Sequence, residues 1–197
     1  MASPRPSAVS KSSPPPRALQ YGFGATSIAA FVLALSTDGV EAILIRERLD
    51  KSALVAELQR RFPNMRVTYD RAATEAAIDA VTAFIENPKK NIALPLVIHG
   101  TEFQRRVWDA VLKIPFGETT TFAEIARRVG SPRAVRAVGS ACTRNPLEFA
   151  IPCHRVLRTD GAYAGGSPWG DRRQKAIVER EARSHGTVRK ARRTKTR

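Results

Sequence analysis

The sequence predicts an α+β protein in which a small α/β unit is followed by a mostly helical part. Two observations support this prediction. Between residues 31 and 86, short apolar runs typical of strands alternate with segments of helical spacing. After residue 100, apolar residues recur every three or four positions, and Gly and Pro separate the segments. The chain has 197 residues, 43% of them hydrophobic, which is enough for one or two packed domains.

The first half contains the candidate strands. Three segments have the apolar pattern of strands: 31–35, 40–45 and 65–69. Two segments have helical spacing: 51–62 and 72–86. The turn Thr37-Asp38-Gly39 predicts a hairpin between the first two strands. We assign these elements to a domain of residues 19–90, with a linker over residues 88–95, and find no evident chemistry in this domain.

The second half begins with a capped helix. Thr101 and Gln104 fit a capping box, in which each side chain bonds to the backbone N–H of the other residue. An apolar stripe follows, and Pro115 and Gly117 end the helix. This half, residues 91–183, is predicted to form one domain.

Two short helices come next, with a tight joint between them. The first covers residues 122–129 and ends at Gly130. Ser131 and Pro132 then fit the N-cap and the first position of a second helix. Two helices joined in this way predict a helix-turn-helix.

The second short helix separates an apolar face from a basic one. Val135, Val138 and Cys142 share one side, so we expect Cys142 to pack in the core. Three arginines and two small residues share the other side: Arg133, Arg136, Ala137, Ser140 and Arg144. A solvated surface helix would show the same pattern. We favour a recognition helix, because small residues between arginines allow the backbone to approach DNA closely.

The charge balance indicates a polyanionic partner. The formal net charge is +15 and the pI is about 11.0. Such an excess points to nucleic acid or, less often, to an acidic membrane surface. Much of it lies near the termini, and we expect disordered tails at residues 1–18, which are rich in Ser and Pro, and at residues 184–197, which are basic. These tails either solubilise the chain or attract phosphates.

No segment predicts a membrane span. The longest apolar run, residues 28–35, is far too short to cross a bilayer. The N-terminus lacks the layout of a signal peptide. We therefore expect a soluble, cytoplasmic protein.

The most informative stretch, residues 145–156, contains a cysteine beside two basic residues. His154 and Arg155 follow Cys153, and positive neighbours favour the thiolate, which is the nucleophilic form. A buried structural cysteine is the alternative. Cys142 is the only other cysteine, so a four-cysteine zinc site is excluded, and we expect neither a metal nor a cofactor.

The last predicted helix, residues 171–183, offers an acid for His154. A reactive histidine is usually oriented by a carboxylate. Glu181 lies four residues after Ile177 and therefore on the apolar face, whereas Glu179 points outward. We predict that Glu181 orients His154; a glutamate in a surface salt bridge is the alternative.

The run Pro152-Cys153-His154-Arg155-Val156 resembles the active-site signature of the O6-alkylguanine-DNA alkyltransferases, also called methylated-DNA–protein-cysteine methyltransferases. Other stretches resemble further segments of this family: 114–120, 133–139, Asn145-Pro146, Trp169-Gly170 and 180–182. The similarity extends over about residues 19–182. It is greatest to the alkyltransferase half of the bacterial Ada proteins.

This resemblance implies a fold and a function. The first domain is then ribonuclease H-like, and the second resembles a winged helix-turn-helix. The protein would bind double-stranded DNA containing O6-alkylguanine as a monomer, in association with the bacterial nucleoid. It would flip the damaged base out and transfer the alkyl group irreversibly to its own cysteine, once per molecule. O4-alkylthymine would be a second substrate.

The resemblance also assigns roles to individual residues. Cys153 would attack the alkyl carbon, His154 would accept the proton of Cys153 through a water, Glu181 would orient His154, and Asn145 would hold the hinge before the active-site loop. Arg136 would fill the gap left by the flipped base. The remaining DNA-binding residues would be Phe122, Arg133, Ala137 and Ser140. Pro152, Val156 and Ser167 would line the substrate pocket.

Two departures from the family pattern affect these expectations. Phe122 stands where the family usually has tyrosine, whose hydroxyl helps to flip the base and protonates the leaving guanine. Losing this donor costs on the order of 1–3 kcal/mol, so we expect slower transfer. The loop at residues 165–170 is one residue longer than usual and lacks a tyrosine, which affects the alkyl-group preference.

Two other functions are compatible with parts of the sequence. Phe122 and the altered loop would suit a DNA-damage binder that does not transfer the alkyl group. The Cys153–His154 pair alone would suit a cysteine hydrolase unrelated to DNA, although the arginine-rich helix argues against it.

Overall fold

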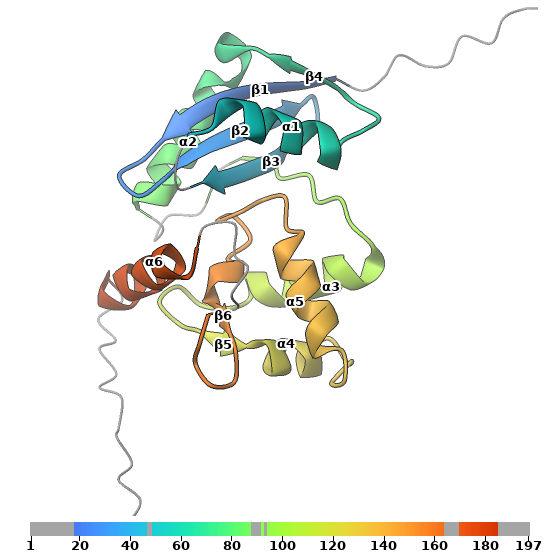
Figure 1. The fold of residues 1–197 in the computed structure, drawn as a ribbon, viewed down its shortest axis with the longest axis vertical. Coiled ribbons are helices and arrows are strands. Elements are labelled where there is room, and N and C mark those ends of the chain that lie inside the picture. Colours follow the sequence, from blue (N-terminus) through green and yellow to red (C-terminus); the bar gives the residue numbers. More distant parts are fainter. Residues whose placement is uncertain (1–17, 47–48, 88–91, 93, 164–169, 185–197) are drawn as a thin grey trace, which may run out of the picture.

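The computed structural model describes residues 18–46, 49–87, 92, 94–163 and 170–184. A four-stranded sheet with the order β3-β2-β1-β4 forms the first half (Figure 1). Its strands are β1 (Ala18–Ala25), β2 (Ala30–Ser36), β3 (Gly39–Arg46) and β4 (Arg66–Tyr69). β2 pairs antiparallel with β1 and β3, while β4 runs parallel to β1. The mixed α+β class, the hairpin and the third predicted strand are confirmed.

Strand β1 was not predicted, because glycines interrupt its apolar pattern. These glycines serve close packing. A Cβ atom on Gly22 would lie 2.3 Å from Thr74 Oγ1 on the helix that covers this face, and one on Gly24 would lie 2.2 Å from the Phe31 ring. The local sequence therefore has low strand propensity where the sheet needs a close approach.

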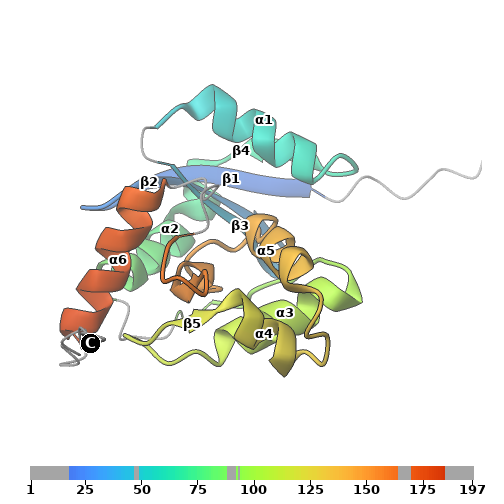
Figure 2. The ribbon, with the colours of Figure 1, turned by 60° about the horizontal axis from the view of Figure 1, so that its bottom comes forward.

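The sheet is buried on both faces. Helix α1 (Lys51–Arg61) covers one face, and α2 (Arg71–Glu86) covers the other together with the second half of the chain (Figure 2). Successive residues of β2 alternate between the two cores: Phe31 and Leu33 face α2, and Val32 and Ala34 face α1. Both helices are capped by an aspartate, and both correspond to predicted helices.

The second half packs three helices beneath the sheet (Figure 1). They are α3 (Glu102–Leu112), α4 (Phe122–Arg128) and α5 (Val135–Thr143). The capping box at the start of α3 is confirmed. The 3₁₀ turn η1 (Cys153–Arg155) and the short parallel strands β5 (Thr120–Thr121) and β6 (Val156–Leu157) follow, and α6 (Asp171–Ser184) lies against η1. Among the described residues, no helix is long and apolar enough to cross a membrane.

The predicted start of the second short helix is wrong. Ser131 and Pro132 belong to a turn, which is closed by a 2.9 Å hydrogen bond from Ala134 N–H to the Ser131 carbonyl, and α5 begins at Val135. Because the turn takes up the four residues after Gly130, Arg133 lies outside the helix. Val135 is 37% exposed, and the buried face of α5 consists of Val138 and Ala141.

Two segments of the second half run along the outer edge of β3. Residues 95–97 exchange two backbone hydrogen bonds with Val40, each of 2.9 Å, and residues 146–148 exchange two with Ile43, of 2.8 and 3.0 Å. The loop between α5 and η1 is thus attached directly to the sheet. The predicted tails lie outside the described residues, except that Ala18 belongs to β1 and Ser184 to α6.

Candidate active site

Cys153 opens the 3₁₀ turn η1, at the end of the loop that joins it to α5. Its thiol is free and only partly buried. The Asn145 side-chain amide Nδ2 lies 3.6 Å from the sulfur. Cys142, on the last turn of α5, packs against the same core cluster as Cys153, in agreement with the packing role predicted for it.

Asn145 holds the loop that carries Cys153. Its side chain is buried; Oδ1 accepts the Leu147 N–H at 2.9 Å, and Nδ2 donates to the Ile151 carbonyl at 3.0 Å. Between these contacts, Phe149 adopts a φ of 73°, a conformation that a bulky side chain rarely accepts. Asn145 therefore stabilises a strained turn shortly before Cys153.

We expect Asn145→Ala to lower the free energy of unfolding by about 2–4 kcal/mol, because it leaves the buried Leu147 N–H without a partner and removes one of the two hydrogen bonds to the Ile151 carbonyl. Chemical denaturation measures this loss. Asn145→Asp keeps the acceptor but buries an unpaired carboxylate whose second oxygen faces the Ile151 carbonyl, so it should lose at least as much stability at pH 7. Equal stability of Asn145→Ala and the wild type would contradict the assigned role.

Glu181 joins His154 and Arg155 in a buried cluster. Its Oε1 lies 2.9 Å from His154 Nε2, and its carboxylate accepts from Arg155 Nε at 2.7 Å and Nη2 at 3.1 Å. Glu181 is 2% exposed, whereas Glu179 faces solvent, so the predicted orientation of α6 is confirmed. Gln174, on the same helix, donates to the His154 carbonyl at 3.1 Å.

The charges of this cluster fix the protonation of His154. Burial alone would raise the pKa of Glu181, but the hydrogen bonds from His154 and Arg155, the charge of Arg155 and the charge that His154 carries when protonated outweigh it and lower the pKa to about 2. Burial lowers the pKa of His154, so the ring is neutral at pH 7. Since an ionised carboxylate cannot donate, Nε2 carries the hydrogen and Nδ1 is the basic nitrogen. The cluster can therefore accept a proton.

The positive environment expected around the Cys153 sulfur is not supplied by its two basic neighbours. His154 and Arg155 both bind Glu181, so their sequence position beside Cys153 does not bring positive charge to the thiol. A hydrogen bond with Cys142 and burial raise the pKa of Cys153 well above its ordinary value, whereas the hydrogen bond from Asn145 lowers it. Cys153 is thus a neutral thiol at rest and needs a base to become nucleophilic.

The residues predicted to bind DNA lie on α4, α5 and the turn between them. Arg136 and Ala137 are exposed on the first turn of α5, and Ser140 is half-buried one turn later. Arg133 is exposed in the turn before α5, and Phe122 is 8% exposed at the start of α4. The structure therefore places Arg136 on the helix that leads to the Cys153 loop and Arg133 in the turn before this helix.

The predicted pocket residues divide into two groups. Pro152 and Val156 are buried on either side of η1, and the Val156 N–H donates to the Cys153 carbonyl. Ser167 and the altered loop at residues 165–169 lie outside the described residues.

Two structural roles at this site were missed. Arg155 also donates to the Ile114 carbonyl at 3.0 Å, which ties η1 to the end of α3. Glu148 is 4% exposed; its Oε2 accepts the Ile45 N–H at 2.6 Å, and its Oε1 lies 3.4 Å from Arg46 Nη1. A carboxylate within the apolar run of residues 147–151 is the signal that could have shown this link to β3.

Comparisons with known proteins agree with this arrangement. Residues 102–183 match the family described as 6-O-methylguanine DNA methyltransferase, DNA binding domain. The chain is 40% identical over 114 residues to the methylated-DNA–protein-cysteine methyltransferase of Mycobacterium tuberculosis, covering 58% of this chain and 68% of that protein. It is 44% identical over 151 residues to the regulatory protein Ada of Salmonella typhimurium, covering 77% of this chain but only 42% of that protein.

The fold is also similar to that of a solved structure. The crystal structure of Mycobacterium tuberculosis OGT in complex with DNA superimposes with a TM-score of 0.68 and 31% sequence identity. The match covers 83% of this chain and 93% of that one, so both halves of the fold are shared.

Proposed function

Because the chain belongs to the family of methylated-DNA–protein-cysteine methyltransferases, we propose that it repairs DNA by transferring the alkyl group of O6-alkylguanine to Cys153. O4-alkylthymine is a second proposed substrate. The observation that carries this proposal is that Cys153, a partly buried residue with a free thiol, directly precedes the buried His154–Glu181 pair in η1. The protein works as a monomer on double-stranded DNA in the bacterial cytoplasm and nucleoid.

The chemistry is a single displacement. His154 Nδ1, through a water, accepts the Cys153 proton, and Glu181 stabilises the imidazolium that forms. The thiolate attacks the alkyl carbon, the bond between this carbon and guanine O6 breaks, and its electron pair stays on guanine, which takes up a proton. The thioether at Cys153 is not cleaved, so each molecule reacts once.

The base reaches Cys153 by leaving the duplex. We assign a ribonuclease H-like fold to residues 19–90, which serve as a scaffold. We assign a winged helix-turn-helix-like fold to residues 91–183. Arg136, exposed at the start of α5, fills the gap left by the flipped guanine, while Arg133, Ala137 and Ser140 contact the backbone and groove. The Cys153 and Val156 carbonyls accept hydrogen bonds from the guanine amino group.

Mass spectrometry after incubation with O6-methylguanine DNA tests this function. We expect a gain of one methyl group, located on the peptide that contains Cys153, and no further gain on a second exposure. DNA binding without any adduct would instead favour the damage binder suggested by Phe122. If the protein neither binds the DNA nor gains a methyl group, the assignment to DNA repair is contradicted.

Phe122→Tyr is expected to speed transfer about tenfold, because it restores a hydroxyl donor worth on the order of 1–3 kcal/mol at the position where the family has tyrosine. Single-turnover kinetics with O6-methylguanine DNA measure this rate. Phe122→Leu, which removes the ring without adding a donor, serves as the control. A Phe122→Tyr variant no faster than the wild type would show that this hydroxyl is not needed here.

A further inference from the structure

A basic pocket lies where α1 meets the end of α5. It has a volume of about 570 Å³ and is lined by residues of α1, α3, α5 and the loop that follows α5. Its charged lining consists of four arginines and one glutamate: Arg46, Arg60, Arg61, Arg144 and Glu57. Without counting His99, these residues give the pocket a formal charge of +3.

Two of the arginines, Arg46 and Arg61, are bound by other groups of the protein. Glu57 forms a short ion pair with Arg46, and it binds Arg61 at 2.7 Å. Arg61 also donates to the Arg144 and Asn145 carbonyls, at 3.3 and 3.2 Å, so it binds the C-terminal end of α5. The single carboxylate in the lining is therefore already occupied by these two arginines.

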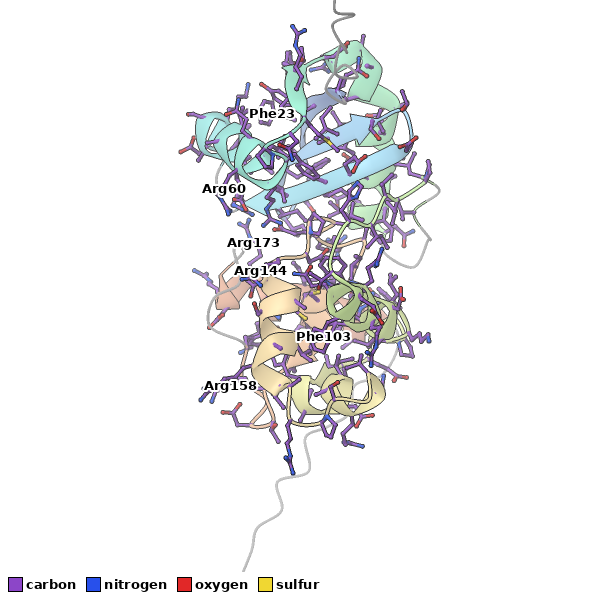
Figure 3. All side chains as sticks on the ribbon, turned by 90° about the vertical axis from the view of Figure 1, so that its right-hand side faces the viewer. Phe23, Arg60, Phe103, Arg144, Arg158 and Arg173 are labelled. Carbon is purple, nitrogen blue, oxygen red and sulfur yellow. The ribbon has the colours of Figure 1, made fainter. Side chains whose placement is uncertain are left out.

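The other two arginines are available to an anion. The Arg60 side chain is 73% exposed and lies 3.6 Å from Glu57, in a pair too loose to hold it. Arg144 is exposed, and among the described residues no carboxylate lies within ion-pair distance of its guanidinium group. Figure 3 shows Arg60 and Arg144 on the same side of the molecule.

The pocket also continues the exposed face of α5. Arg136, Ser140 and Arg144 occupy successive turns of this helix, and Arg144 closes it at the pocket. Eight residues of helix span about 12 Å. Along a DNA strand this length corresponds to about three or four nucleotides, at about 3.4 Å each.

We propose that this pocket binds a backbone phosphate of the duplex held by α5, about three or four nucleotides from the flipped base. Helix α1 of the first domain is then part of the DNA-binding surface. The phosphate lies between Arg60, which is only loosely paired with Glu57, and Arg144, which has no carboxylate partner among the described residues. A guanidinium fork matches the phosphate oxygens. This inference rests on the proposed function, since it requires α5 to lie on DNA.

Arg60→Ala tests the proposal, with Arg71→Ala as a matched control. The Arg71 side chain is 75% exposed and lies 3.6 Å from Glu75 on its own helix, so the two variants lose the same charge from the same environment. Arg71 directly follows β4, at the sheet edge opposite β3. We expect Arg60→Ala to weaken binding about three- to tenfold and to reduce the slope of log K against log salt by about 0.9. Arg71→Ala should change neither quantity.

Truncated duplexes locate the contact. Binding is measured on a duplex with the lesion in the centre and on two duplexes cut two base pairs beyond the lesion, one on each side. We expect the effect of Arg60→Ala to disappear on one truncated duplex and to remain on the other. Equal effects on all three duplexes, or equal effects of Arg60→Ala and Arg71→Ala, would overturn the proposal.

Methyl transfer at saturating DNA separates this inference from the proposed function. If the wild type methylates Cys153 but Arg60→Ala binds DNA as tightly as the wild type, only the phosphate site is overturned. If Arg60→Ala weakens DNA binding as expected but the wild type gains no methyl group, only the proposed chemistry at Cys153 is overturned.

Discussion

Replacing Cys153 with alanine is expected to abolish methyl transfer completely while leaving DNA binding intact. The alanine variant has no nucleophile, whereas Arg136 and the other exposed residues of α5 are unchanged. Mass spectrometry after incubation with O6-methylguanine DNA, together with a binding titration, measures both effects. A methyl group on any other residue of this variant would falsify the assignment of Cys153.

Cys142→Ala is the matched control for this experiment, because it removes the other thiol. The hydrogen bond with Cys142 raises the pKa of Cys153, so its loss lowers that pKa. We expect Cys142→Ala to keep transfer to Cys153 and to extend it to lower pH than in the wild type. A pH profile of the transfer rate shows the shift. Loss of transfer in both cysteine variants would mean that the two thiols act together.

Replacing Glu181 with glutamine is expected to cause the second large loss. The neutral amide of the Glu181→Gln variant would leave the buried Arg155 charge unpaired, which typically costs about 3–5 kcal/mol. The substitution would also remove the anion that stabilises a protonated His154, so transfer should slow as well. Glu179→Gln, an exposed position on the same helix, should change neither stability nor transfer.

The pH dependence of stability distinguishes this cluster from ordinary packing. The folded pKa of Glu181 is lowered from about 4.5 to about 2, which stabilises the fold above pH 5 by about 3 kcal/mol. Because a lowered carboxyl pKa loses its contribution as pH falls, the wild type should lose this stability between about pH 5 and pH 2. The difference between the wild type and Glu181→Gln should shrink over the same range. A constant difference would contradict the charge-based explanation.

Patterns that act within one element or between adjacent elements could be predicted from the sequence. The capping box of α3 and the inward position of Glu181 depend on spacing along a single helix, and the hairpin of β2 and β3 depends on two neighbouring strands and the short turn between them. Strand β1 could not be predicted in this way, because Gly22 is required by a neighbour 52 positions later, Thr74. The start of α5 was predicted wrongly for a related reason. Ser131 and Pro132 fit the start of a helix, but residues 131–134 form the turn between α4 and α5.

The chemistry of the site depends on contacts that sequence neighbours do not reveal. His154 and Arg155 stand beside Cys153 in the chain, yet they bind Glu181, 27 and 26 residues away, so the thiol receives no positive charge from them. Glu148 binds the backbone of Ile45 across 103 residues. The sequence could therefore suggest Cys153 as a nucleophile and His154 as its base, but not the pKa of the Cys153 thiol.

The attachment of residues 146–148 to β3 has a consequence for how the protein is made. The strand that they cover lies about 100 residues earlier. During synthesis residues 95–97 can cover the outer edge of β3 at Val40, but the edge at Ile43 stays open until residue 148 has left the ribosome. An open strand edge is a template for pairing between chains. The first half made alone should therefore aggregate. Nascent chains should depend on chaperones until residues 146–148 have been synthesised and pair with β3.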